Sequence, residues 1–355
     1  MRSGRLVLLL LSSMLFCGVA IARAEAPAGP RLAAISFHPY PNAGSELSSL
    51  APDGSDPFRI AGGSEAGGPS PILGARPSWS ADGSRVAFLG AGGDVVLSAA
   101  FTVVADGSDP KVVPLSRRLS IWGDPVIAPD GRSVAVMRIE PVGKPFKRLL
   151  RRDRGSDGPR ARTAIWLLGA DDSGMRPLTP WSRGTLLEPS SFSPDGSRLA
   201  ATEWRGEGAT GRAISIDLAT RRAKVLARNA AEPVYATDGS VAMVRHRHEE
   251  KWRLEELAIG SSTLLVLPAG GGRPRPLVRV RGGLRWPSWD PSGQRIAFTR
   301  LRRASRKSPI PGPNSIAEIN ADGTCLTTVA KLTRGFFAGS AWQPGPGREA
   351  GRIAC

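Results

Sequence analysis

The sequence predicts an all-β protein, a six-bladed β-propeller built from four-stranded antiparallel blades. The first observation is a motif that recurs along the chain, clearest as FSPDGSRLAA at 192–201. It has an apolar start, a polar turn with glycine and an alternating apolar run, which is the pattern of a β-hairpin. Secondly, its copies lie about 40 to 65 residues apart, the spacing of propeller blades. Finally, 42 glycines and 31 prolines among 355 residues favour short strands and tight turns.

Five complete hairpins are expected to form the first half of a blade. They are 79–88, 127–136, 192–201, 235–244 and 289–298. Each turn needs a residue with positive φ, which glycine adopts freely and aspartate tolerates. The fourth copy is one residue shorter after its glycine, and the fifth has Ser292-Gly293 in place of Asp-Gly.

Six further strand pairs should form the second halves of the blades. They are 47–60, 101–113, 165–179, 214–226, 264–278 and 317–330. The first half of the sixth blade is split, because 31–37 reads as a lone second strand and 341–345 as a lone first strand. A ring closed by strands from both chain ends protects edges that would otherwise stay unpaired. We therefore expect a propeller over residues 25–345 and a C-terminal tail over 346–355.

The repeated Trp/Phe-Ser-Pro-Asp-Gly-x-x-Ile/Leu/Val-Ala-Phe pattern resembles the repeat of TolB-like six-bladed propellers. The resemblance covers residues 31–345 and implies the fold. TolB proper carries an α/β domain before its propeller, whereas here the repeats begin almost at a predicted cleavage site. The resemblance therefore does not imply TolB's own role as a periplasmic partner of an outer-membrane lipoprotein.

Residues 1–24 have the pattern of a signal peptide. A basic start is followed by an apolar stretch too short to span a membrane comfortably, and then by Ala22-Arg23-Ala24. The bulky Phe16 before Cys17 disfavours a lipoprotein site. Cleavage would lower the formal charge from +17 to +14, with 45 basic and 31 acidic residues remaining. We expect an exported monomer, extracellular or periplasmic, with no membrane anchor after cleavage.

The predicted long loops, 140–163, 246–261 and 301–314, all join the second strand of a blade to the third, so they should share one face. Two of them are strongly basic, which favours binding of an acidic protein or an anionic envelope polymer. The alternative, that these loops are only solvated, has equal weight. Export makes nucleic acid an unexpected partner. The candidate binding residues are Lys144, Lys147, Arg148, Arg151, Arg152, Arg154, Arg302, Arg303, Arg306 and Lys307.

One local cluster has the chemistry of metal ligands: His246, His248 and Glu249. A His-x-His pair on a strand can place two imidazoles on one side. No third ligand of matching spacing is evident, and the neighbouring Arg245 and Arg247 would repel a cation. A solvated polar loop is the preferred interpretation. The alternative is a hydrolase or lyase with an active site at the mouth of the central channel, using His246 and His248.

Other candidates have structural explanations. The residues that open each hairpin, such as Trp79 and Trp289, have the period of the blade and should pack between blades. Asp82 and Asp195 should hold their turns. No Gly-x-Ser-x-Gly, phosphate-binding loop or Cys-x-x-Cys occurs, so we expect no cofactor and favour a binding protein over an enzyme.

Two cysteines remain after the predicted cleavage, Cys325 and Cys355. An exported chain with an even number of cysteines permits a disulfide. Cys325 should begin the fourth strand of its blade, and the ten-residue tail is long enough to bring Cys355 to it. We expect a Cys325–Cys355 bond rather than two free thiols.

Overall fold

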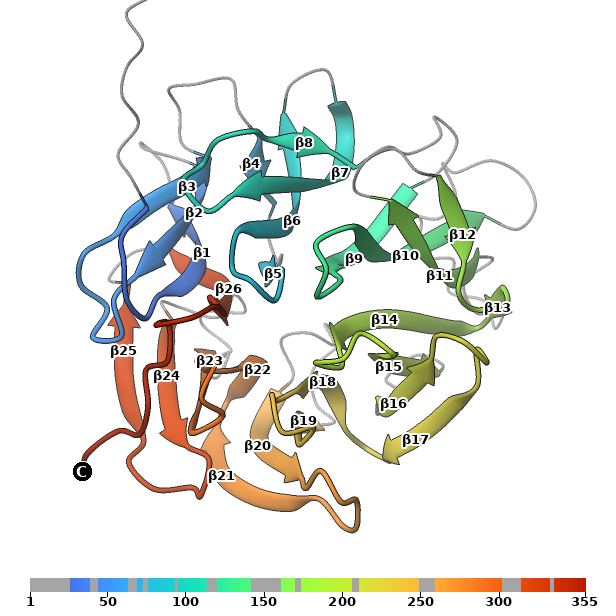
Figure 1. Cartoon of the computed structure of the whole chain (residues 1–355). Coiled ribbons are helices and arrows are strands. Elements are labelled where there is room, and N and C mark those ends of the chain that lie inside the picture. The colour runs from blue at the N-terminus through green and yellow to red at the C-terminus, as the bar shows by residue number, and fades with distance from the viewer. Residues whose placement is uncertain are drawn as a thin grey trace, which may run out of the picture.

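The computed structural model describes residues 26–38, 44–62, 69–72, 76–92, 95–113, 120–141, 161–169, 174–205, 211–248, 259–301, 314–332 and 335–355. These residues form strands and turns, without a helix. Six antiparallel sheets stand around a common axis (Figure 1), so the predicted six-bladed propeller is confirmed.

The blades, called A to F, have these strands from the axis outward. Blade A contains β26 (Phe336–Trp342), β1 (Leu32–His38), β2 (Gly44–Leu50) and β3 (Phe58–Gly62). Blade B contains β4 (Ser70–Pro71) and β5 (Ser78–Trp79), both paired with β6 (Arg85–Gly92), then β7 (Val95–Val104) and β8 (Lys111–Val112). Blade C contains β9 (Ser120–Ile127), β10 (Ser133–Pro141) and β11 (Ala161–Gly169), with β12 (Met175–Pro177) and β13 (Ser182–Arg183) outermost. Blade D contains β14 (Thr185–Phe192), β15 (Arg198–Arg205), β16 (Arg212–Asp217) and β17 (Ala223–Ala227). Blade E contains β18 (Ala231–Tyr235), β19 (Val241–His248), β20 (Ile259–Leu267) and β21 (Arg275–Arg281). Blade F contains β22 (Gly283–Trp289), β23 (Arg295–Leu301), β24 (Ser315–Asn320) and β25 (Thr327–Lys331).

Blade A is assembled from both ends of the chain. β26 pairs with β1, and Leu32 faces Trp342 across the pair. Both side chains are buried and belong to one apolar cluster. The predicted closure, one inner strand from the C-terminal region and three strands from the N-terminal region, is confirmed.

The first-half turns follow one plan in which glycine alone has positive φ. In blade B, the Gly83 amide donates to the Ser80 carbonyl at 2.9 Å, and Gly83 has φ +68°. This is a type I turn followed by a left-handed glycine. Asp82 does not share the positive φ. Its Oδ1 accepts the amide of Ser84 at 3.0 Å, so its side chain holds the turn as expected. Asp195 accepts the amide of Ser197 in the same way.

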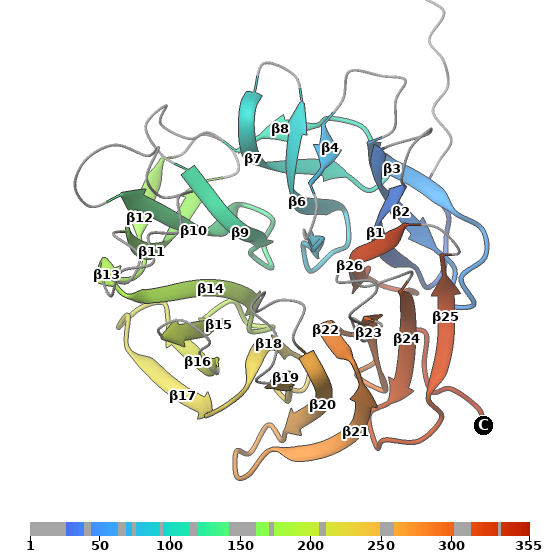
Figure 2. The same cartoon turned by 180° about the vertical axis from the view of Figure 1, so that it is seen from behind.

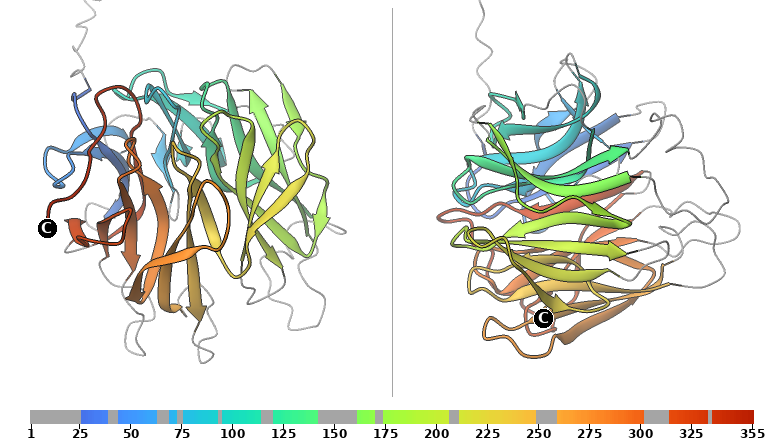
Figure 3. Two further views of the ribbon diagram at one scale, coloured as in Figure 1. Left: turned by 60° about the horizontal axis from the view of Figure 1, so that its bottom comes forward. Right: turned by 90° about the vertical axis from the view of Figure 1, so that its right-hand side faces the viewer.

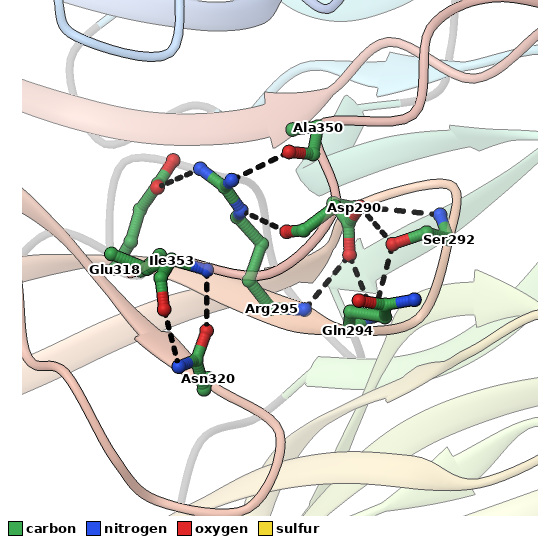
Figure 4. Close-up of polar contacts among 9 residues, drawn as sticks. Asp290, Ser292, Gln294, Arg295, Glu318, Asn320, Ala350 and Ile353 are labelled. Atoms are coloured by element: carbon green, nitrogen blue, oxygen red, sulfur yellow. Dashed lines mark hydrogen bonds and ion pairs between the residues drawn. The ribbon is translucent and has the colours of Figure 1, made fainter. Parts of the chain in front are cut away.

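The two atypical turns compensate in different ways. In the shorter fourth copy, the Ala236 amide donates to the Ser240 carbonyl at 2.8 Å, one residue earlier than in the other copies. In the fifth copy, Asp290 precedes the turn, and its Oδ1 accepts the amide of Arg295 at 2.8 Å (Figure 4). The aspartate thus replaces the serine hydroxyl that accepts the equivalent amide in blades B and D.

The residues that open the hairpins pack between blades, as expected. Trp79 and Trp289 are buried, and their indole nitrogens reach carbonyl oxygens of the preceding blade. Trp79 donates to Ala341 at 3.3 Å and Trp289 to Val234 at 3.1 Å. The bulky side chain therefore supplies both the apolar contact and a hydrogen bond that sets the angle between blades.

The C-terminal tail lies along blade F (Figure 4). Arg295 donates to the carbonyl oxygens of Ala350 at 2.6 Å and Gly351 at 2.5 Å, and its third nitrogen pairs with Glu318 at 3.0 Å. The side-chain amide of Asn320 donates to the backbone carbonyl of Ile353 and accepts from its backbone amide. Buried polar side chains of blade F thus hold the backbone of the tail.

The strand order defines two faces of the ring. The first-to-second and third-to-fourth turns lie on one face, and the second-to-third connections on the other, which we call the b–c face. Figure 2 shows the ring from the face opposite to that of Figure 1, and the side view in Figure 3 shows strands running between the two faces. β10, β19 and β23 all end at the b–c face, as expected for the strands before the long segments.

Candidate functional site

The basic residues proposed from the sequence lie outside the described residues. They are Lys144, Lys147, Arg148, Arg151, Arg152 and Arg154 in the segment after β10, and Arg302, Arg303, Arg306 and Lys307 in the segment after β23. Described residues border both segments. Pro141 and Ala161 flank the first, and Leu301 and Asn314 flank the second.

On blades C and D, four arginines near the b–c face are paired with carboxylates. Glu140 lies 2.7 Å from Arg162 and 3.5 Å from Arg138. Glu203 lies 2.7 Å from Arg205 and also pairs with Arg212. Each glutamate sits between two guanidinium groups, so the positive charge of these four arginines is half compensated.

Blade E carries four exposed arginines without such compensation. Arg245 and Arg279 flank Thr263, and Arg247 and Arg281 flank Ser261, across β19, β20 and β21. All four arginines are exposed. Among the described residues, the ion pairs formed by arginines include none of these four. The two rows, which we call the arginine ladder, end at the b–c face.

His246 points to the other side of blade E. Its Nδ1 lies 3.0 Å from the hydroxyl of Ser262, which accepts the amide of Leu284 at 3.1 Å. His248 is the last residue of β19 and follows a shift in the pairing register. Its side chain and Glu249 lie outside the described residues. Across the residues that the structure covers, no three His, Cys, Asp or Glu are grouped closely enough to hold a metal ion.

The structure adds a group of charged residues that the sequence reasoning missed. We call it the axial cluster, because its members lie on the innermost strands or directly before one. It consists of Arg76, Asp124, Glu188, Glu232 and Arg285. Arg76, Asp124 and Glu232 are almost completely buried. Glu188 and Arg285 are half-buried.

The axial cluster connects blades to one another. The backbone amide of Arg76 donates to Asp124 at 2.8 Å, which joins blade B to blade C. The guanidinium of Arg76 donates to the Ser190 carbonyl of blade D at 2.7 Å. Glu232 of blade E pairs with Arg285 and accepts the amide of Trp286 at 2.6 Å, both on blade F. Charged hydrogen bonds thereby link the inner edges of blades B, C and D, and separately those of blades E and F.

The charges of the cluster act on one another. Burial raises the pKa of Asp124 to about 7, although Arg76 opposes the rise. Burial also raises the pKa of Glu188, and Arg285 opposes that rise. Burial acts in the same direction on Glu232, but the positive charges of Arg285 and His246 outweigh it, so the pKa of Glu232 lies below its ordinary value. Asp124 can therefore change protonation near neutral pH.

A sequence signal for this cluster exists. The dipeptides Arg76-Pro77, Asp124-Pro125, Glu188-Pro189 and Glu232-Pro233 recur seven or eight residues before the turn glycine, and Arg285 precedes Trp286-Pro287. Proline cannot donate to the strand ladder, and the pairing register shifts beside the proline in blades C to F. Such bulges redirect side chains. In blades B to F, a charged residue one or two positions before a proline, on or just before the innermost strand, is thus a detectable repeat.

The two cysteines lie together at the rim of blade F. Cys325 is joined to Cys355, with Cα atoms 5.3 Å apart, a normal separation for a disulfide. Cys325 lies in the turn two residues before β25 rather than at the start of that strand, which corrects the expected boundary. The bond holds the end of the tail beside the rim, where the C-terminus is seen in Figure 1.

No protein-family model and no curated protein matches the sequence. Solved structures do match. TolB from Acinetobacter baumannii superposes with a TM-score of 0.62 at 18% identity, over 89% of this chain and 67% of that one. A putative TolB from Agrobacterium tumefaciens gives 0.57 at 16% identity, over 86% and 90%. The fold is that of the TolB propeller.

The same propeller also matches part of an enzyme. A puromycin hydrolase superposes with a TM-score of 0.53 at 17% identity, over 87% of this chain and 47% of the hydrolase. Similarity to TolB at this level therefore concerns architecture. No helix among the described residues has the length and apolar character needed to cross a membrane.

Proposed function

We propose that this chain is an exported binding or scaffolding module whose b–c face engages an anionic envelope polymer or an acidic protein. The observation that supports the proposal is that the two basic segments, 142–160 and 302–313, both follow strands that end at the b–c face. Clustered like charges reinforce one another within about 8 Å at physiological salt. The fold shared with TolB is consistent with a binding role.

The test is replacement of residues 142–160 by an uncharged Gly-Ser segment in the mature protein. Binding to polyanionic envelope material, measured by co-sedimentation at low salt, should fall several-fold because seven basic residues are removed. The matched control replaces 206–210, a second-to-third connection of blade D without a basic residue. Equal binding by the two variants and the parent protein would disprove the role of the basic segments.

The competing function is a hydrolase or lyase with an active site at the mouth of the central channel, with His246 and His248 as metal ligands or bases. His246 is held by its contact with Ser262, the residue opposite it across the β19–β20 pair. Substitution of both histidines by alanine should leave polymer binding unchanged. A catalytic activity in the parent protein that this double variant loses would favour the enzyme instead.

A further inference from the structure

We infer that the arginine ladder of blade E is a binding site for a linear, non-peptide polyanion that carries repeated phosphate or uronate groups. The inference rests on the proposed function and names the place and the ligand class. It uses only described residues, and it does not depend on the basic segments after β10 and β23.

The geometry of the ladder is regular. Residues two apart on a strand point to the same side, so Arg245 and Arg247 share one side of the sheet with Arg279 and Arg281. Their Cα atoms are separated by about 6.6 Å along each strand and about 9.6 Å from β19 to β21. These spacings are close to the screening length at physiological salt, so an anion on the ladder experiences all four charges.

Within the part of the chain that the structure describes, the ladder arginines form no ion pair, whereas four arginines of blades C and D do. On blades C and D, Glu140 and Glu203 already accept the guanidinium groups around them. On blade E, two of the four arginines each donate one hydrogen bond to a neighbouring oxygen atom. Arg245 donates to the Asn229 carbonyl at 3.1 Å, and Arg279 donates to the Ser261 hydroxyl at 3.2 Å. Each guanidinium has five N–H groups, so most donors of the ladder are available to oxyanions.

The surroundings of the ladder favour a polymer over a folded protein. Between the arginines lie Ser261 and Thr263, both half-buried, and beside Arg245 lies the exposed Asn229. The centre of a protein–protein interface is normally apolar or aromatic. A row of hydroxyls between arginines instead offers hydrogen bonds to phosphate or uronate oxygens. Figure 2 shows β19, β20 and β21 side by side in this blade.

Binding of three defined probes tests the inference: polyphosphate, polygalacturonate and poly-aspartate, by calorimetry at 50 and 200 mM salt. Two double variants remove one row each, Arg245→Gln with Arg279→Gln, and Arg247→Gln with Arg281→Gln. Each should weaken polyphosphate or polygalacturonate binding about tenfold at low salt and reduce its salt dependence. The control, Arg221→Gln with Arg222→Gln, removes two exposed arginines from the opposite face and should change affinity less than about twofold.

The outcomes separate the two proposals. Row variants that fold, by thermal unfolding, and bind both polymers like the parent protein would overturn the ladder while leaving the proposed function intact. A parent protein that binds none of the probes would overturn both. Ladder-dependent binding of poly-aspartate that exceeds binding of both other polymers would assign the site to acidic polypeptides and overturn the polymer class. Single Arg281→Gln and Arg279→Gln variants replace any double variant that does not fold.

Discussion

The side-chain amide of Gln343 donates a 2.8 Å hydrogen bond to the carbonyl oxygen of Gly83, which joins the first turn of blade B to the residue that follows the last strand of the ring. The Pro344 carbonyl oxygen lies 2.0 Å from the position where a Cβ on residue 83 would stand. Gly131 has almost the same φ, +69° against +68°, but a Cβ there would meet nothing closer than 3.7 Å. Alanine would thus be strained by its φ at both positions, but only at position 83 would its Cβ also clash with a neighbouring backbone atom.

Gly83→Ala should therefore destabilise the protein more than Gly131→Ala. Both variants place alanine in the left-handed region, which costs about 1–2 kcal/mol. Only at position 83 must the backbone at Pro344 also move, which should add roughly 2 kcal/mol. Urea unfolding of both variants measures the difference. Equal unfolding midpoints would mean that blade B and the ring closure are not in contact as described.

Removing residues 336–355 should abolish cooperative unfolding, because β1 loses its inner partner and Leu32 loses the Trp342 contact. An unpaired, apolar strand edge also promotes association between molecules. Removing only 346–355 leaves β26 in place and should preserve a cooperative transition. Thermal unfolding and size-exclusion chromatography compare the two truncations. A cooperative, monomeric protein without β26 would contradict the closure.

Reduction of Cys325–Cys355, or Cys355→Ser, should lower the free energy of unfolding by roughly 2–4 kcal/mol, because the bond restricts the unfolded chain. The remaining contacts of the tail, from Arg295 and Asn320, should keep the folded ring intact. Thiol titration of the mature protein under denaturing, non-reducing conditions provides the direct measurement. Two titratable thiols would exclude the disulfide.

Stability should decline as the pH rises from about 4 to 7, in part because of Asp124. Its pKa is about 7 in the folded chain against an ordinary value of 3.8, so folding favours the protonated carboxyl. This contribution is fully present below pH 4 and is lost as the pH approaches 7. Asp124→Asn should remove roughly 2 kcal/mol of the decline between pH 5 and 8. Asp130→Asn, at an exposed carboxyl in the turn that follows, is the control. Parallel pH profiles for Asp124→Asn and the parent protein would contradict the burial effect.

The repeats sufficed to predict the fold because each blade is encoded locally, by a turn glycine and alternating apolar residues. Closure was predictable because the unmatched strands at 31–37 and 341–345 complement each other. The axial cluster was not predicted, since its members become neighbours only when five blades surround one axis. The arginine ladder was not predicted either, because Arg245 and Arg279 meet through strand register and not through sequence spacing.

The pairing of β1 with β26 also has a consequence for biosynthesis. The earliest strand to emerge must wait for one of the latest, so no partly synthesised chain can complete the circle. For a protein delivered unfolded across a membrane, this order delays locking until translocation is almost finished. In the export that we propose, the architecture would thus keep the polypeptide unfolded during translocation and make it rigid only afterwards.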